Sequence, residues 1–230
     1  HLSLRRQRQM CIRDSNNALD ILRLGRKSYD KVWDRQKRLV DERRLGTVPD
    51  TLILVEHDPV YTLGKNSNEN HLLRSRDKHI PVYQIERGGD VTFHGPGQLV
   101  GYPILDLHDH RLSVSWYMET LEAVLIETLG QFCIEARHRA GLTGVWVGEE
   151  KIAALGVRLS RWVSMHGFAL NVNTDLKFFD GIIPCGIFEY DVTSMTRVLG
   201  KEVSMVEVEE TLISIFRKLF SFQKCELAHA

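Results

Sequence analysis

The chain has 230 residues, a length that indicates one or two domains. Lys and Arg balance Asp and Glu at 30 each, so no net charge attracts nucleic acid or an acidic membrane surface. No apolar run approaches the roughly 18 residues of a membrane span. The cysteines are Cys11, Cys133, Cys185 and Cys225. They form no C-x-x-C pair, which argues against a zinc site or a disulfide framework and favours a reducing compartment.

Residues 1–15 differ in character from the rest of the chain. They contain four arginines and show no apolar periodicity. A transit peptide is also basic and poor in acidic residues, but this segment lacks the serine-rich amphipathic pattern of one. Gln7–Ser15 also resembles translated sequencing-adaptor read-through. We therefore expect residues 1–15 to be a non-native or disordered leader and residues 16–230 to form a single domain.

The first predicted elements are a helix and three strands. Apolar residues recur at helical spacing over Tyr29–Arg43, which predicts an amphipathic helix. Short apolar runs then predict strands over Thr51–Glu56, Val60–Leu63 and Ile80–Ile85. The last of these leads directly into a glycine-rich stretch, residues 87–98.

A fourth strand, Leu99–Leu105, leaves the glycine-rich stretch. Pro103 predicts an edge strand or a bulge, because proline lacks the N–H that an inner strand donates. The next periodic segment, Ser115–Leu129, predicts a second helix, with Gly130 placed to end it.

The second half of the chain is predicted to contain a hairpin and a third helix. Strands are expected over Leu142–Val147, Lys151–Arg158 and Trp162–Val172, and the first two form the hairpin. The capping box from Ser204 to Glu207 starts the helix. Together the elements predict an α+β domain with a mixed, mostly antiparallel sheet covered by helices.

The glycine-rich stretch reads Arg-Gly-Gly-Asp-Val-Thr-Phe-His-Gly-Pro-Gly-Gln. A backbone with so few side chains lets a ligand approach closely. Arg87, Asp90, Thr92 and His94 lie among the glycines, which favours a pocket wall. The alternative is a glycine-rich turn between two strands. The spacing matches neither the dinucleotide fingerprint nor the Walker pattern, so we predict no nucleotide site.

Cys185 is a candidate nucleophile because it stands between Pro184 and Gly186. Stiff backbone holds the thiol on one side, and the other side is open to approach. A nucleophilic cysteine must be ionised, and at an ordinary pKa near ~8.5 only a few per cent is thiolate at neutral pH. A nearby cation would raise that fraction. The alternative is a buried structural thiol, since free cysteine is among the most buried residue types.

Lys151 is the candidate for that cation. It opens a strand of small and apolar residues that includes Ala154 and Gly156, as though something must lie against this strand. In such surroundings a lysine loses its charge at low cost and can serve as a base. The alternative is a hairpin lysine that points into water. His94 and His166 are each followed by glycine, so a Cys/His acyl-transfer pair is also possible. The sequence has no H-E-x-x-H motif, so we predict no metal site.

Four motifs occur together and in order, at residues 87–98, Lys151–Gly156, His166–Val172 and Ile183–Gly186. With them the sequence resembles the octanoyl-[acyl-carrier-protein]:protein N-octanoyltransferase family, the lipoyl (octanoyl) transferases. The resemblance runs from about Leu24 to about Phe220. Phe93 is a mild departure, because many members have tyrosine there. The missing hydroxyl should alter a hydrogen bond rather than the reaction.

The resemblance implies a biotin/lipoate protein ligase-like fold and a two-step reaction in residues 16–230. An octanoyl group passes from octanoyl-acyl carrier protein to a cysteine thioester and then to a lysine of a lipoyl domain, the first step of endogenous lipoate biosynthesis. Cys185 holds the position of the family's nucleophile and Lys151 that of its activating lysine. The implied substrate-binding residues are Arg87, Gly88, Gly89, Asp90, Val91, Thr92, Phe93, His94, Ala154, Leu155, Gly156, Gly167, Phe168 and Ala169, with His166 in a supporting role.

The implied acceptors are the lipoyl domains of 2-oxoacid dehydrogenase E2 subunits and the glycine cleavage H protein. We expect no cofactor, no metal, no nucleic-acid or membrane partner, a monomer, and a cytoplasmic location (mitochondrial if the source is eukaryotic). Three alternatives are a non-catalytic binder of acyl groups or lipoyl domains, an ATP-dependent lipoate-protein ligase and, more remotely, an amidase that works in reverse.

Overall fold

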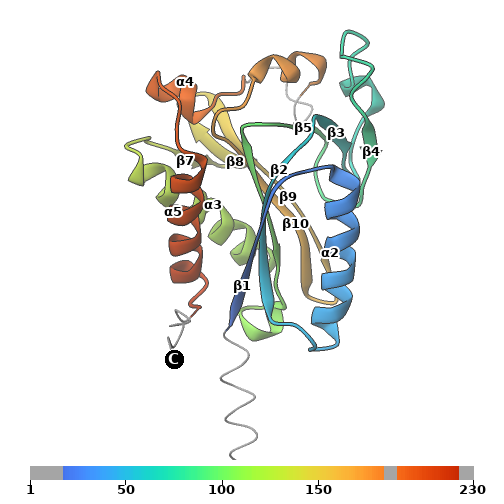
Figure 1. Ribbon diagram of the computed structural model, residues 1–230, viewed down its shortest axis with the longest axis vertical. Coiled ribbons are helices and arrows are strands. Elements are labelled where there is room, and N and C mark those ends of the chain that lie inside the picture. Colours follow the sequence, from blue (N-terminus) through green and yellow to red (C-terminus); the bar gives the residue numbers. More distant parts are fainter. Residues whose placement is uncertain (1–17, 184–190, 223–230) are drawn as a thin grey trace, which may run out of the picture.

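The computed structural model describes residues 18–183 and 191–222 (Figure 1). Residues 1–17, 184–190 and 223–230 are outside the described part. The predicted leader at residues 1–15 and the predicted nucleophile Cys185 therefore both lie outside the described residues.

The main sheet has seven strands in the order β1-β2-β6-β10-β9-β8-β7 (Figure 1). These are β1 (Leu19–Lys27), β2 (Asp50–His57), β6 (Gln98–Ile104), β7 (Arg137–Arg139), β8 (Leu142–Val147), β9 (Glu150–Ser160) and β10 (Val163–Asn171). Only β1 and β2 run parallel; the other neighbouring pairs in this sheet of the described chain are antiparallel.

A smaller sheet of three strands has the order β4-β3-β5. Its members are β3 (Val60–Leu63), β4 (Val82–Gln84) and β5 (Val91–His94). β3 is parallel to β4 and antiparallel to β5. The predicted mixed, mostly antiparallel architecture is thereby confirmed.

Helices cover both faces of the main sheet (Figure 1). The α-helices are α2 (Tyr29–Arg44), α3 (Val114–Gln131), α4 (Met195–Leu199) and α5 (Met205–Leu219), and the short 3-10 helices are Glu69–His71, Leu107–Asp109 and Leu176–Gly181. α2 packs on one face, and α3 and α5 pack together on the other. Among the described residues, no helix is both long and apolar enough to cross a membrane.

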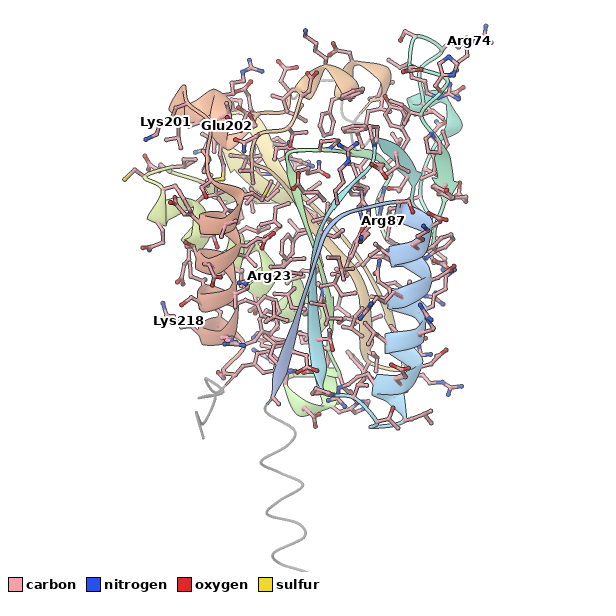
Figure 2. The ribbon with its side chains drawn as sticks, in the orientation of Figure 1. Arg23, Arg74, Arg87, Lys201, Glu202 and Lys218 are labelled. Carbon is pink, nitrogen blue, oxygen red and sulfur yellow. The ribbon has the colours of Figure 1, made fainter. Side chains whose placement is uncertain are left out.

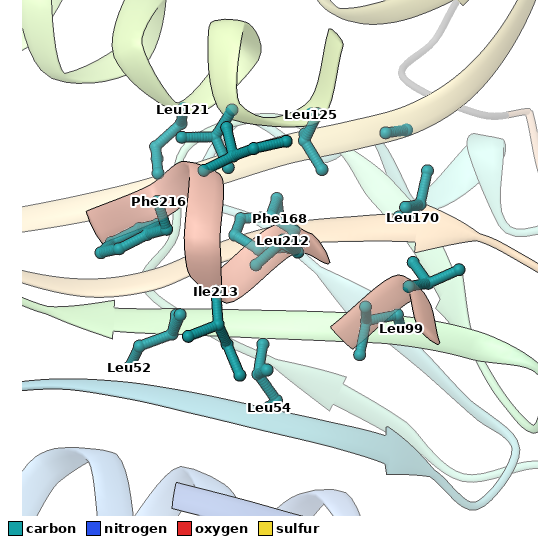
Figure 3. Close-up of a cluster of buried hydrophobic side chains, with 14 of the residues drawn as sticks. Leu52, Leu54, Leu99, Leu121, Leu125, Phe168, Leu170, Leu212, Ile213 and Phe216 are labelled. Carbon is teal, nitrogen blue, oxygen red and sulfur yellow. The ribbon is translucent and has the colours of Figure 1, made fainter. Parts of the chain in front are cut away.

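Strand alternation divides the core between the two faces. Leu52 and Leu54 of β2 pack in the cluster that contains α3 and α5, as Figure 3 shows. Ile53 and Val55, which point the other way, pack in the cluster with Tyr29 of α2. The α2 face is the one that carries the candidate site.

The predicted helices and strands are all present, with shifts at some ends. The capping box is confirmed at its N-cap, where the Ser204 hydroxyl accepts a hydrogen bond from the Glu207 N–H at 3.3 Å. Gly130 was expected to end the second helix, but α3 continues through it to Gln131, and Phe132 is the C-cap. The sequence did not predict β1, β5, β7 or α4.

Of the two expectations for Pro103, the edge strand is wrong, because β6 lies between β2 and β10, and the ladder of β6 with β2 shows no bulge at Pro103. The register of β6 with β10 ends at the pair Gly101–Phe168, before Pro103. The Ser164 hydroxyl then donates to the Pro103 carbonyl at 2.8 Å and accepts from the Leu105 N–H at 2.9 Å. Proline is tolerated inside this sheet because a side chain bridges the interrupted ladder.

Candidate functional site

A pocket that is partly open to solvent lies on the α2 face of the main sheet. The residues that line it are Tyr29, Arg87, Gly89, Asp90, Val91, Thr92, His94, Val100, Tyr102, Ala154, Leu155, Gly156, His166, Gly167, Phe168 and Ala169. Three sequence segments predicted to bind substrate thus meet at one place.

The pocket does not include every predicted residue, and it includes some that were missed. Gly88, Phe93 and the predicted catalytic Lys151 do not line it. Tyr29, Val100 and Tyr102 do, although the sequence did not single them out. Val100 and Tyr102 are two positions apart on the strand that leaves the glycine-rich stretch, so their side chains point to the same face. This period of two could have predicted that they line the pocket together.

The Arg87–Asp90 loop is tied down on both sides. The Gly88 N–H donates to the Val157 carbonyl of β9 at 3.0 Å. Arg87 is buried near the first turn of α2 (Figure 2), and its Nη2 donates to the Thr62 carbonyl at 2.8 Å. A Cβ on Gly156 would lie 2.9 Å from the Gly88 carbonyl oxygen. Because Gly156 has no side chain, the Arg87–Asp90 loop can lie directly against β9. The loop then forms one wall of the pocket.

Phe93 anchors the loop from behind. It is fully buried in a separate aromatic cluster, where its ring stacks on Phe178 with centroids 4.8 Å apart and meets Phe179 edge-on. Its two neighbours in β5, Thr92 and His94, line the pocket. Phe93 fixes their strand by burying its own side chain on the far side.

A bulge in β9 turns Lys151 toward the pocket face. Val145 of β8 pairs with Ala153 of β9. The next β8 residue, Trp146, pairs with Lys151, so Ile152 is an extra residue between the two pairs. Ile152 and Ala153 both pack in the core beneath α3 and α5. Alternation then places Lys151 on the opposite face, an effect typical of bulges beside functional sites.

The side chain of Lys151 is buried, so the interpretation as a hairpin lysine in water is wrong. Its Nζ donates to the Thr143 carbonyl at 3.2 Å and lies 4.8 Å from the centroid of the Trp146 ring. The ring face is a favourable neighbour for a cation. On the backbone, the Lys151 N–H donates to the Asp191 carbonyl at 2.9 Å, and its carbonyl accepts from Thr193 at 3.0 Å.

Two buried amides connect the pocket to this lysine. The Gln98 Nε2 donates to the Phe93 carbonyl at 3.2 Å and to the Asn171 Oδ1 at 2.9 Å. The Asn171 Nδ2 donates in turn to the carbonyl of Thr193 at 3.0 Å. Thr193 is the residue that bonds to the Lys151 carbonyl. The amide chain therefore holds the segment beside Lys151 against the pocket wall.

The same network assigns the tautomer of His94. Because both Gln98 donors are used, its Oε1 must accept from His94 Nδ1, 2.8 Å away. His94 thus carries its proton on Nδ1 and presents an unprotonated Nε2. His57 follows the same logic, with Nδ1 at 3.0 Å from the Lys27 carbonyl and Nε2 at 2.8 Å from the Tyr102 hydroxyl.

The buried histidines are neutral. Burial lowers the pKa of His94 to about 3, with further contributions from His57 and Arg87. Burial, then the nearby cations Arg87 and Arg158, lower the pKa of His166 to about 3. Burial also lowers the pKa of His57 to about 4. Groups with such pKa values are weak bases near neutral pH, which disfavours a Cys/His pair and leaves Lys151 as the better candidate.

Comparison with known proteins gives a consistent result. A model of the lipoyl protein ligase A/B catalytic domain family matches residues 28–217. An octanoyltransferase from Rubrobacter xylanophilus is 46% identical over 220 residues, which cover 91% of this chain and 97% of the relative. An octanoyltransferase from Solibacter usitatus is 50% identical over 204 residues, which cover 87% of this chain and 92% of the relative.

Solved structures of low sequence identity share the fold. A bipartite lipoate protein ligase from Thermoplasma acidophilum matches with a TM-score of 0.67 at 18% identity, over 91% of this chain and 87% of that one. A biotin protein ligase from Aquifex aeolicus, in complex with biotin and ATP, matches with a TM-score of 0.56 at 17% identity, over 88% and 70%. The predicted biotin/lipoate ligase-like fold is confirmed.

The neutral histidines predict a pH dependence of stability. Their pKa is near 6.5 in an unfolded chain and about 3 to 4 in the fold, so only the unfolded state takes up protons as the pH falls below about 6.5. Each histidine should lower the free energy of unfolding by up to about 1.4 kcal/mol per pH unit between about pH 6 and pH 4. Urea unfolding at several pH values measures this slope. His57→Gln should reduce the slope and the exposed His138→Gln should not; equal slopes would contradict the assignment.

The amide chain predicts a local loss of order in Asn171→Asp. This change keeps the acceptor for Gln98 but sets a carboxylate oxygen against the Thr193 carbonyl. Amide exchange at Thr193 should quicken by at least about tenfold, because an unsatisfied buried group costs about 1–3 kcal/mol. Asn173→Asp is the matched control, since Asn173 Nδ2 donates to the Val203 carbonyl at 2.7 Å. Hydrogen-exchange mass spectrometry should show the Thr193 effect in the first variant alone, and unchanged protection there would refute the chain's role.

Proposed function

The chain belongs to the lipoyl protein ligase A/B catalytic domain family and to the octanoyltransferases within it, and we propose that this acyltransferase moves an octanoyl group from acyl carrier protein to a lysine of lipoyl domains. The observation that carries the proposal is a pocket lined by β9, the strand that also carries the buried Lys151. Its walls include Val91, Ala154, Leu155 and Ala169, which suit a straight alkyl chain.

The proposed donor is octanoyl-acyl carrier protein, and the proposed acceptors are the lipoyl domains of 2-oxoacid dehydrogenase E2 subunits and the glycine cleavage H protein. A thioester is already activated for acyl transfer, so the reaction needs no nucleotide. The bipartite ligase from T. acidophilum has an E2 lipoyl domain as its partner, which supports an acceptor of this kind.

We assign the nucleophile to Cys185, which lies outside the described residues. Its described sequence neighbours support the assignment. On one side, the Ile183 N–H donates to the His71 carbonyl at 2.8 Å, and on the other side Asp191 bonds to Lys151. The strand that carries Lys151 is therefore paired with the chain that leaves the Cys185 segment.

The reaction proceeds in two acyl transfers. The Cys185 sulfur attacks the thioester carbonyl, a new carbon–sulfur bond forms, and the carrier thiol leaves with the proton that the cysteine gave up. The lysine amine of the lipoyl domain then attacks the acyl-cysteine, and Cys185 leaves as a thiol. Lys151 acts in both steps. It takes the Cys185 proton, its ammonium stabilises the thiolate, and it passes that proton to the leaving carrier thiolate; its amine, now neutral, then takes a proton from the incoming lysine and gives it to the leaving Cys185 thiolate.

The proposed function predicts transfer without ATP. Purified protein, octanoyl-acyl carrier protein and a lipoyl domain should give octanoylated domain in a buffer stripped of ATP and Mg²⁺. The fold is shared with ligases, one of which was solved with ATP bound. The control reaction therefore supplies free octanoate and ATP in place of octanoyl-acyl carrier protein. A strict ATP requirement, or faster use of free octanoate, would move the protein to the ligase class. No transfer in either reaction would favour a non-catalytic binder.

Lys151 predicts a different response in each half-reaction. Lys151→Ala should slow both the acylation of Cys185 and its discharge to the lipoyl domain by about 10²–10⁴-fold, the range of general acid–base catalysis. Lys151→Arg should restore acylation more than discharge, because arginine keeps the charge but cannot act as a base. Rapid-quench mass spectrometry times the two steps. Lys201→Ala, which removes an exposed lysine that does not line the pocket, is the control. Wild-type rates in both Lys151 variants would disprove the mechanism.

A further inference from the structure

We propose that His166 is the end wall of the acyl pocket and sets the length of the acyl chain that the enzyme accepts, an inference that rests on the proposed function. The ladder between β9 and β10 fixes where the wall stands. Gly156, next to the wall, pairs with Gly167, and the following pair is Val157 with His166. His166 lines the pocket, whereas the next residue toward the hairpin, Met165, does not.

A strained backbone directs the His166 ring into the pocket. In β10, Ala169 packs on the α2 face, whereas Phe168 and Leu170 belong to the core beneath α3 and α5. With regular alternation, the His166 side chain would lie on the same face of the sheet as that of Phe168. Its φ of 60° breaks the alternation, and its ring lies instead 6.4 Å from the Tyr102 ring on the pocket face. A non-glycine residue at positive φ in a strand is strained and persists only where surrounding contacts stabilise it, as they often do at functional sites.

A hydrogen bond holds the His166 peptide, whereas the ring has only the Glu86 carboxylate near it, with Oε2 3.8 Å from Nε2. The Gln36 Oε1 of α2 accepts from the His166 N–H at 2.9 Å, which fixes the strained peptide. The ring itself is buried, yet neither of its nitrogens has a hydrogen-bond partner among the described residues. Buried polar atoms without partners need a reason, and a ligand surface is one. An alkyl end packed against this ring would break no hydrogen bond of the described protein.

The distance along the strand agrees with an eight-carbon chain. From Ala154 to Val157, the partner of His166, β9 advances by about 10 Å at ~3.3 Å per residue. An extended eight-carbon acyl chain is about 9 Å long, since a single bond of ~1.5 Å advances a zigzag chain by roughly 1.25 Å. Lys151 lies three residues before Ala154 in β9, beyond the end of this path that is opposite to His166, so the chain points its methyl end at His166.

His166→Gly tests the wall without straining the fold, because glycine adopts a φ of 60° readily and keeps the N–H that Gln36 accepts. The kcat/KM values for octanoyl-, decanoyl- and dodecanoyl-carrier protein are compared. The ratio of decanoyl to octanoyl should rise by at least about tenfold in the variant, the effect of accommodating extra methylenes in an apolar pocket. Arg161→Gly is the matched control, since Arg161 also has a positive φ of 51° but lies in the β9–β10 turn outside the pocket.

Binding of free octanoate, decanoate and dodecanoate by calorimetry gives a second measurement that needs no chemistry. The variant should shift affinity toward the longer acids, and Arg161→Gly should leave it unchanged. An unaltered length profile in His166→Gly, by either method, would overturn the proposal. Failure of the wild-type protein to transfer octanoate would instead contradict the proposed function, and the binding profiles would still decide the role of His166.

Discussion

The buried amide chain of Gln98 and Asn171 is the constraint on which the site depends. It begins at His94 in the pocket wall and ends at Thr193, whose backbone pairs with Lys151. The amide nitrogens of Gln98 and Asn171 both donate to acceptors, so the chain has one orientation and fixes one tautomer of His94. Satisfied networks of this kind rigidify a core, whereas partly satisfied ones destabilise it. Pocket and lysine, which come from distant parts of the sequence, thereby keep one relative position.

Irregular backbone does the rest of the positioning. A bulge at Ile152 puts Lys151 on the pocket face, and a positive φ at His166 brings a ring into the pocket where alternation would not. Gly156 lets the Arg87–Asp90 loop lie directly on β9. Each departure is a single residue on a regular strand, and together they make a pocket on what would otherwise be a covered sheet face. Strain and bulges of this kind concentrate at functional sites.

Much of the fold could be predicted because its long elements are strongly periodic. The helix from Tyr29 has helical periodicity, and the strands before and after Lys151 are short apolar runs bounded by turn residues. β5 was missed because its four residues stand between glycines, whose turn signal outweighs a short strand. The edge position expected for Pro103 was wrong because the Ser164 hydroxyl, from a distant strand, satisfies the Pro103 carbonyl and the Leu105 N–H inside the sheet. The pocket roles of Tyr29 and the neutral state of His94 depend on packing between distant segments, which local sequence does not encode.

The most direct test of the proposed acyl-enzyme is the intact mass of the protein after incubation with octanoyl-acyl carrier protein and no acceptor. The account predicts a gain of one octanoyl group, located on Cys185 by peptide mapping, removed by a lipoyl domain and absent in Cys185→Ala. Cys133, which is exposed, should stay unmodified and be replaceable without effect. An unmodified protein that still transfers the octanoyl group, or an adduct on another residue that passes to the acceptor, would contradict it.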